Sequence, residues 1–154
     1  DRSPSRGLGD VYKRQQFDKE VIAILKKYKV TPTNGLVCLA GFMRIISPYF
    51  IKKYKNRILN IHPALLPSFP GLDAQKQAIE FGSKFSGCTV HFVDDGIDTG
   101  PIILQGMVNI DKNDTEDSLL AKINKKEHEV LPRAIELISK DKLLFDGRKV
   151  FVKD

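Results

Sequence analysis

The chain has 154 residues, of which 42% are hydrophobic, and carries a formal net charge of +6. This length is sufficient for one domain with a buried core. No apolar run approaches the roughly 20 residues that span a bilayer, and the basic residues are not interleaved with aromatic side chains as in a nucleic-acid-binding patch.

The two cysteines lie in separate apolar runs. Neither Cys38 nor Cys88 belongs to a CxxC pair or to a His/Cys cluster with metal-ligand spacing. We therefore expect two buried, reduced thiols, no bound metal and a cytoplasmic location.

The first sixteen residues differ in character from the rest of the chain. They are rich in Ser, Arg, Gly and Asp, and no apolar period would let them bury a face. We expect residues 1–16 to be a disordered leader and residues 17–154 to form the domain.

Helices and apolar strands alternate from residue 17 onward. The patterns first predict a helix from Phe17 with Val21, Ile24, Leu25 and Tyr28 on its apolar face, a strand buried on both faces at 36–40, and a short helix capped by Ser47. A strand at 57–61, a proline-rich loop at 63–71 and a helix capped by Asp73 and ended by Gly82 follow. The last part is predicted to contain strands at 88–93 and 102–105 joined by a turn at 94–101, a helix from Asp114 to about Ser139 that Pro132 kinks or breaks, and a hairpin around Asp146 and Gly147. This order indicates an α/β fold whose mixed sheet is parallel early and antiparallel at one edge.

One polar pair follows an apolar strand at the point where it enters the proline-rich loop. Asn60 and His62 are two residues apart, so an extended backbone places them on one face. An amide and an imidazole at a strand end can hold a carbonyl oxygen and move a proton. The alternative is a hydrogen-bonded histidine and a turn asparagine.

The turn at 94–101 carries further carboxylates. If it folds over the same end of the sheet, Asp98 would favour the protonated form of His62. Asp94 and Asp95 are more simply explained by turn formation. His91, within an apolar strand, is expected to be a core histidine.

Three segments together resemble a known family. The sequence Leu39-Ala40-Gly41-Phe42-Met43-Arg44-Ile45-Ile46-Ser47, the sequence Leu59-Asn60-Ile61-His62-Pro63-Ala64-Leu65-Leu66-Pro67 and the turn at 94–101 are similar to those of the phosphoribosylglycinamide formyltransferases. The resemblance implies a Rossmann-like mixed sheet and a small-molecule reaction of purine biosynthesis. In that reaction a formyl group passes from 10-formyltetrahydrofolate to the amine of glycinamide ribonucleotide.

The resemblance also implies roles for individual residues. Asn60, His62 and Asp98 would be catalytic, as hydrogen-bond donor to the oxyanion, general acid and proton shuttle. Glu127 would bind the ribonucleotide, and no metal would be required. The folate site would consist of Met43, Arg44, Ile45, Ile46, Asp94, Asp95, Gly96 and Ile97.

The resemblance begins near Phe17 and does not include the strand, phosphate-binding loop and helix with which the family starts. We therefore expect a truncated chain with a foreign leader, weakened ribonucleotide binding and an exposed sheet edge that favours self-association. Two alternatives to the transferase are a formyltetrahydrofolate hydrolase and an inactive folate-binding fragment.

Overall fold

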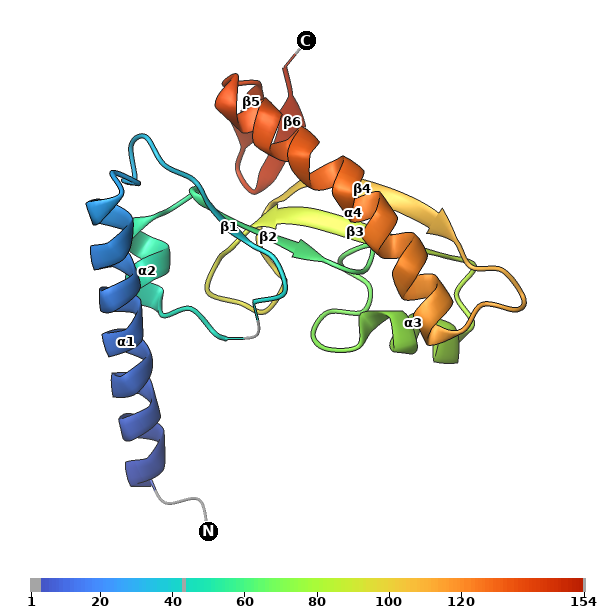
Figure 1. The fold of residues 1–154 in the computed structure, drawn as a ribbon, viewed down its shortest axis with the longest axis horizontal. Helices are drawn as coiled ribbons and strands as arrows, with labels where there is room; N and C mark the ends of the chain where they lie inside the picture. The colour runs from blue at the N-terminus through green and yellow to red at the C-terminus, as the bar shows by residue number, and fades with distance from the viewer. Residues whose placement is uncertain (1–3, 43, 154) are drawn as a thin grey trace. The chain divides into compact units, whose positions relative to one another are not determined.

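A computed structural model describes residues 4–42 and 44–153, with the backbone alone for residues 4–8. The chain divides into two compact units, Asp1–Leu59 and Asn60–Asp154, and each is described by itself. A four-stranded sheet has the order β1-β2-β3-β4, and β5 pairs with β6 (Figure 1). The elements are α1 (Pro4–Lys27), β1 (Val37–Leu39), α2 (Pro48–Lys53), β2 (Ile58–His62), α3 (Ala74–Phe81), β3 (Phe85–Phe92), β4 (Ile102–Asn109), α4 (Glu116–Ser139), β5 (Leu143–Asp146) and β6 (Lys149–Val152).

Helix α1 begins earlier than the sequence pattern predicts. It starts at Pro4, within the segment that the sequence predicts to be a disordered leader. The buried positions of the helix are Asp18 and Ile22, whereas Ile24 and Tyr28 of the predicted apolar face are exposed. Helical spacing identified the helix, but the element packed against it decides which side is covered.

Helix α2 is held to α1 by a buried carboxylate. Asp18 Oδ2 accepts the backbone N–H of Ser47 at 2.6 Å. The Ser47 hydroxyl in turn accepts the N–H of Phe50, so Ser47 is the predicted N-cap of α2. Two buried polar groups are thereby satisfied where the two helices meet.

Strand β1 is not buried on both faces as the apolar run predicts. Cys38 is exposed, whereas Cys88 on β3 is buried, so the expectation of a buried thiol is wrong for Cys38. The reason is the position of β1 at the outer end of the strand order, where a strand has only one neighbour.

Strands β3 and β4 form an antiparallel pair, which confirms the predicted antiparallel edge. The register places Cys88 opposite Gly106 and Thr89 opposite Gln105. A Cβ on Gly106 would meet the side chains of Lys126 and Val130 of α4 at 2.5 and 2.7 Å. Helix α4 therefore covers the Cys88 face (Figure 1). Because side chains alternate along a strand, Thr89 lies on the opposite face.

Three helix predictions need correction. Asp73 lies at the N-cap of α3 in a left-handed conformation, but its side chain makes no capping hydrogen bond. Thr115, not Asp114, caps α4, because Thr115 and Ser118 form a reciprocal capping box. Helix α4 also continues through Pro132 to Ser139, so the proline does not end it.

The hydroxyl of Thr89 anchors the loop that follows β2. It donates to the Ala64 carbonyl at 2.7 Å and accepts the N–H of Leu66 at 3.1 Å. Gln105 Nε2 donates to Thr89 Oγ1 and to the Leu66 carbonyl. One buried hydroxyl thus satisfies backbone groups of both Ala64 and Leu66.

Replacing Thr89 with Val should lower the free energy of unfolding by about 1–3 kcal/mol, because the isosteric side chain leaves the Leu66 N–H unsatisfied. The matched control is Thr89→Ser, which keeps the hydroxyl and should cost less. Urea unfolding of both variants measures the difference. A larger loss in Thr89→Ser than in Thr89→Val would mean that the methyl group, not the hydroxyl, is the stabilising part.

Candidate active site

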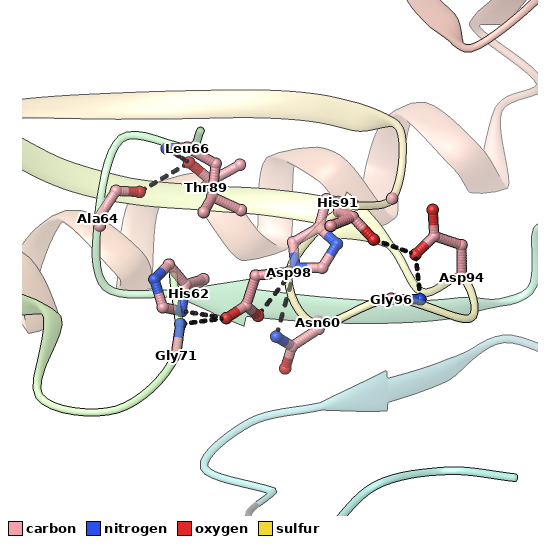
Figure 2. Close-up of polar contacts among 12 residues, drawn as sticks. Asn60, His62, Ala64, Leu66, Gly71, Thr89, His91, Asp94, Gly96 and Asp98 are labelled. Carbon is pink, nitrogen blue, oxygen red and sulfur yellow. Dashed lines mark hydrogen bonds and ion pairs between the residues drawn. The ribbon is translucent and has the colours of Figure 1, made fainter. Parts of the chain in front are cut away.

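The candidate site lies where β2 ends and is built entirely from residues of the second unit. Asn60 and His62 share one face of the strand, as their spacing predicts (Figure 2). Asn60 Nδ2 lies 3.4 Å from His91 Nε2. The predicted residues Asn60, His62 and Asp98 are brought together, and His91 joins them.

Both ring nitrogens of His62 face oxygen atoms. Nε2 donates to the Phe69 carbonyl at 2.8 Å, and Nδ1 lies 3.4 Å from Asp98 Oδ2. The His62 side chain is 5% exposed, so water competes little for either nitrogen. Because both neighbours are acceptors, the imidazolium form, with a proton on each nitrogen, satisfies this geometry.

Asp98 is the group on which the other polar side chains converge (Figure 2). Its Oδ2 atom accepts the N–H of Gly71 at 2.8 Å, while Oδ1 lies 3.7 Å from His91 Nε2. The carboxylate is 12% exposed. A largely buried carboxylate requires donors and an opposite charge, and Gly71 and the imidazolium form of His62 supply both.

The backbone of Asp98 is held in an uncommon conformation. Its φ of 54° lies in the left-handed region, which a non-glycine residue adopts at a cost. The turn compensates through Asp94 Oδ1, which accepts the N–H of Gly96 at 3.0 Å and the hydroxyl of Thr99 at 2.6 Å. A side chain at Gly100 would clash with the Phe92 carbonyl, so the turn lies tightly on the strand end. The structural role expected for Asp94 is therefore present.

His91 is buried, as expected, but it also belongs to the site. Its Nδ1–H donates to the Phe92 carbonyl at 2.8 Å, which leaves the Nε2 lone pair to accept from Asn60. Burial lowers the pKa of His91, against smaller opposing effects of the Phe92 hydrogen bond and Asp98. A neutral His91 with a fixed tautomer orients the Asn60 amide.

The predicted folate residues fall into two groups. Arg44, Ile45 and Ile46 belong to the first unit, where the Arg44 guanidinium lies 4.6 Å from the ring centroid of Phe17, Ile45 is exposed and Ile46 is buried. Met43 lies outside the described residues. The segment 94–97 belongs to the second unit, and Ile97 at its end is exposed.

Glu127 lies on α4 and is partly buried. Burial raises the pKa of Glu127, while His128 and His62 oppose the shift. Burial also raises the pKa of Cys88 to about 11, and the Glu127 carboxylate contributes to this increase. The Cys88 thiol therefore stays protonated at neutral pH, which excludes a thiolate nucleophile at this position.

Neither a metal-binding group nor a membrane-spanning helix is present in residues 4–42 and 44–153. Within these ranges we find no group of three or more His, Cys, Asp or Glu side chains that could hold a metal ion. No helix there is both long enough and apolar enough to cross a membrane.

The sequence patterns did not reveal the residues that support the site from a distance. Thr89 and Gln105 hold the loop after β2, and Arg148 donates to the Thr99 carbonyl at 2.7 Å. The alternation of Thr89 and His91 within an apolar strand was a usable signal, because it marks one polar face. Arg148 gave no local signal.

Comparison with known proteins identifies the family. Residues 5–135 match the family model described as formyl transferase. The trifunctional purine biosynthetic protein adenosine-3 of Drosophila melanogaster is 50% identical over 129 residues, which cover 84% of this chain and 9% of that protein. Phosphoribosylglycinamide formyltransferase of Escherichia coli is 42% identical over 130 residues, or 84% of this chain and 59% of that protein.

A solved structure agrees with these matches. Glycinamide ribonucleotide transformylase 1 from Symbiobacterium toebii superimposes with a TM-score of 0.84 at 48% identity, covering 90% of this chain and 63% of that one. The chain belongs to the formyl transferase family, and the α/β fold expected from the sequence is confirmed. It spans about three fifths of the single-function relatives that it matches.

The lowered pKa of His91 predicts a pH dependence of stability. The unfolded chain binds more protons than the folded one below the ordinary histidine pKa of about 6.5, so stability should fall as the pH drops through that value. The raised pKa of Glu127 has the opposite effect, because the stability that the protonated Glu127 contributes is lost as the pH rises. A comparison with the variant His91→Gln isolates the first effect.

Between neutral pH and about pH 5.5, wild type should lose more unfolding free energy than His91→Gln. His128→Gln, a change at the exposed histidine, leaves His91 in place and should therefore also lose more unfolding free energy than His91→Gln. Urea unfolding at several pH values measures all three proteins. Parallel curves for wild type and His91→Gln would contradict a buried, neutral His91.

Proposed function

We propose that this chain carries the catalytic residues for transfer of a formyl group from 10-formyltetrahydrofolate to the amine of glycinamide ribonucleotide. The observation that supports it most directly is the contact of the Asp98 carboxylate with His62, with Asn60 on the same strand face. The names of the bacterial relatives support the choice of substrates. The folate is a substrate that donates the group.

Asn60 would stabilise the oxygen of the transferred group. One hydrogen of its Nδ2 atom is directed to His91, and the other remains available as a donor. When the amine nitrogen attacks the formyl carbon, negative charge develops on the formyl oxygen. A fixed amide donor stabilises this charge more than it stabilises the uncharged carbonyl group.

His62 would provide the proton. In this structure its Nε2–H is directed to the Phe69 carbonyl, so a substrate oxygen or nitrogen would replace that carbonyl as the acceptor. As the bond from the formyl carbon to the folate nitrogen breaks, that nitrogen gains one proton. The attacking amine loses one proton, so the two transfers balance.

Asp98 would keep His62 in the imidazolium form and accept the amine proton. Its Oδ2 atom already faces the His62 ring, and the Gly71 N–H holds it there. The carboxylate thus links the two proton transfers without changing the total charge of the site.

The remaining sequence expectations complete the proposal. The donor would contact Met43, Arg44, Ile45 and Ile46 and the backbone of 94–97, and Glu127 would bind the ribonucleotide. The reaction would take place in the cytoplasm, in keeping with free cysteines at positions 38 and 88.

The direct test is formyl transfer by this chain, with free formate measured in parallel with and without ribonucleotide. The variant His62→Ala should lower the transfer rate by about 10²–10⁴-fold, the usual contribution of a positioned acid. His128→Ala removes an exposed histidine and should transfer at the wild-type rate.

Two results would overturn the proposal. Formate release that does not depend on the ribonucleotide would indicate the hydrolase instead. Folate-analogue binding without transfer or formate release would indicate a binding fragment.

Replacement of Asp98 by Asn should lower the transfer rate on the order of 10²-fold, because the amide cannot accept the amine proton. It should also change the ¹⁵N NMR spectrum of the His62 ring, because the carboxylate that faces Nδ1 at 3.4 Å is replaced by an amide. Asp117→Asn, on the exposed first turn of α4, is the matched control. An unchanged ring spectrum would show that the carboxylate does not act on His62.

A further inference from the structure

The turn at 94–101 is held from outside by a residue of the C-terminal hairpin. The Arg148 guanidinium donates from Nη2 to the Thr99 carbonyl at 2.7 Å and lies 3.5 Å from the Gly100 carbonyl. Thr99 directly follows Asp98. We propose that Arg148 is a positioning residue that keeps the Asp98 carboxylate against His62, an inference that rests on the proposed function of this pair.

The hairpin is itself fixed, so Arg148 can act as an anchor. Lys153 Nζ donates to the Asp141 carbonyl at 2.8 Å and closes the open end of the hairpin. The ring of Phe145 packs on Phe92 with centroids 5.5 Å apart. Gly147, with φ of 57°, forms the tight turn that precedes Arg148. Arg148 therefore extends from a short rigid turn rather than from a loose tail.

The turn needs support on this side. Upstream of Asp98, the Asp94 carboxylate holds Gly96 and Thr99. Downstream, the chain returns to the strand end, where the Phe92 N–H donates to the Pro101 carbonyl at 2.9 Å. Between these anchors Arg148 Nη2 meets the carbonyls of Thr99 and Gly100.

The geometry explains why arginine suits this position. Both carbonyls are met by one nitrogen, Nη2, whose two hydrogens are fixed in the guanidinium plane, whereas the ammonium hydrogens of a lysine rotate. A charged donor to a neutral carbonyl also makes a stronger hydrogen bond than a neutral donor does. Arg148 is exposed, so water reduces this contribution.

The first test measures position without requiring activity. The Gly71 N–H donates to Asp98 Oδ2, so its hydrogen exchange reports whether the carboxylate stays in place. In Arg148→Ala, hydrogen exchange at Gly71 should accelerate about three- to tenfold. This is less than complete loss of a buried hydrogen bond to a charged group would cause. Arg148→Lys should recover part of the protection. Lys149→Ala, with the same loss of charge on the same hairpin, should change nothing.

The second test separates turnover from binding. Arg148→Ala should lower kcat for formyl transfer about three- to tenfold with little change in KM for either substrate, because the variant misplaces Asp98 and touches no substrate. Exchange of the β3 and β4 amides should stay at the wild-type rate, which excludes general unfolding.

The outcomes distinguish this inference from the proposed function. Unchanged Gly71 exchange in Arg148→Ala would overturn the positioning role, whatever the chain catalyses. If Gly71 exchange is faster in Arg148→Ala but the wild-type chain transfers no formyl group, the positioning role is supported and the proposed function is overturned. Equal effects of Arg148→Ala and Lys149→Ala on Gly71 exchange would show that the loss of a surface charge, and not of the contact with Thr99, is responsible.

Discussion

The site depends on one largely buried carboxylate. Asp98 accepts the Gly71 N–H, faces His62 at 3.4 Å and lies 3.7 Å from His91. A carboxylate that is only 12% exposed has lost most of its hydration, and its partners must replace it. The same carboxylate therefore contacts the loop after β2 at Gly71, faces Nδ1 of His62 and belongs to the turn at 94–101.

The two histidines near Asp98 differ in what surrounds their nitrogens. His62 faces two oxygen acceptors, so a proton on each nitrogen is satisfied. His91 donates to the Phe92 carbonyl and accepts from Asn60, so the neutral ring is satisfied. Burial lowers the pKa of His91 in the same direction. One carboxylate thus lies between a histidine suited to donate a proton and one suited to orient an amide.

Most of the support for this arrangement comes from residues other than Asp98 and the two histidines. Thr89 and Gln105 fix the loop that carries Phe69 and Gly71, and Asp94 and Arg148 hold the turn from its two sides. Helix α4 covers the opposite face of β3 and β4, where Gly106 permits its close approach. The polar side chains Thr89 and His91 therefore lie on the face that α4 does not cover, while the covered face provides burial and stability.

The sequence alone determined several local features of the fold. Ser47 caps α2, the chain turns at Gly147, and Asn60 and His62 share a strand face, because capping, turn formation and alternation depend on residues a few positions apart. The tertiary structure decided what those residues meet. His91 faces Asn60 across 31 positions and Arg148 reaches Thr99 across 49. Such contacts follow from strand register and hairpin packing, which no local spacing encodes.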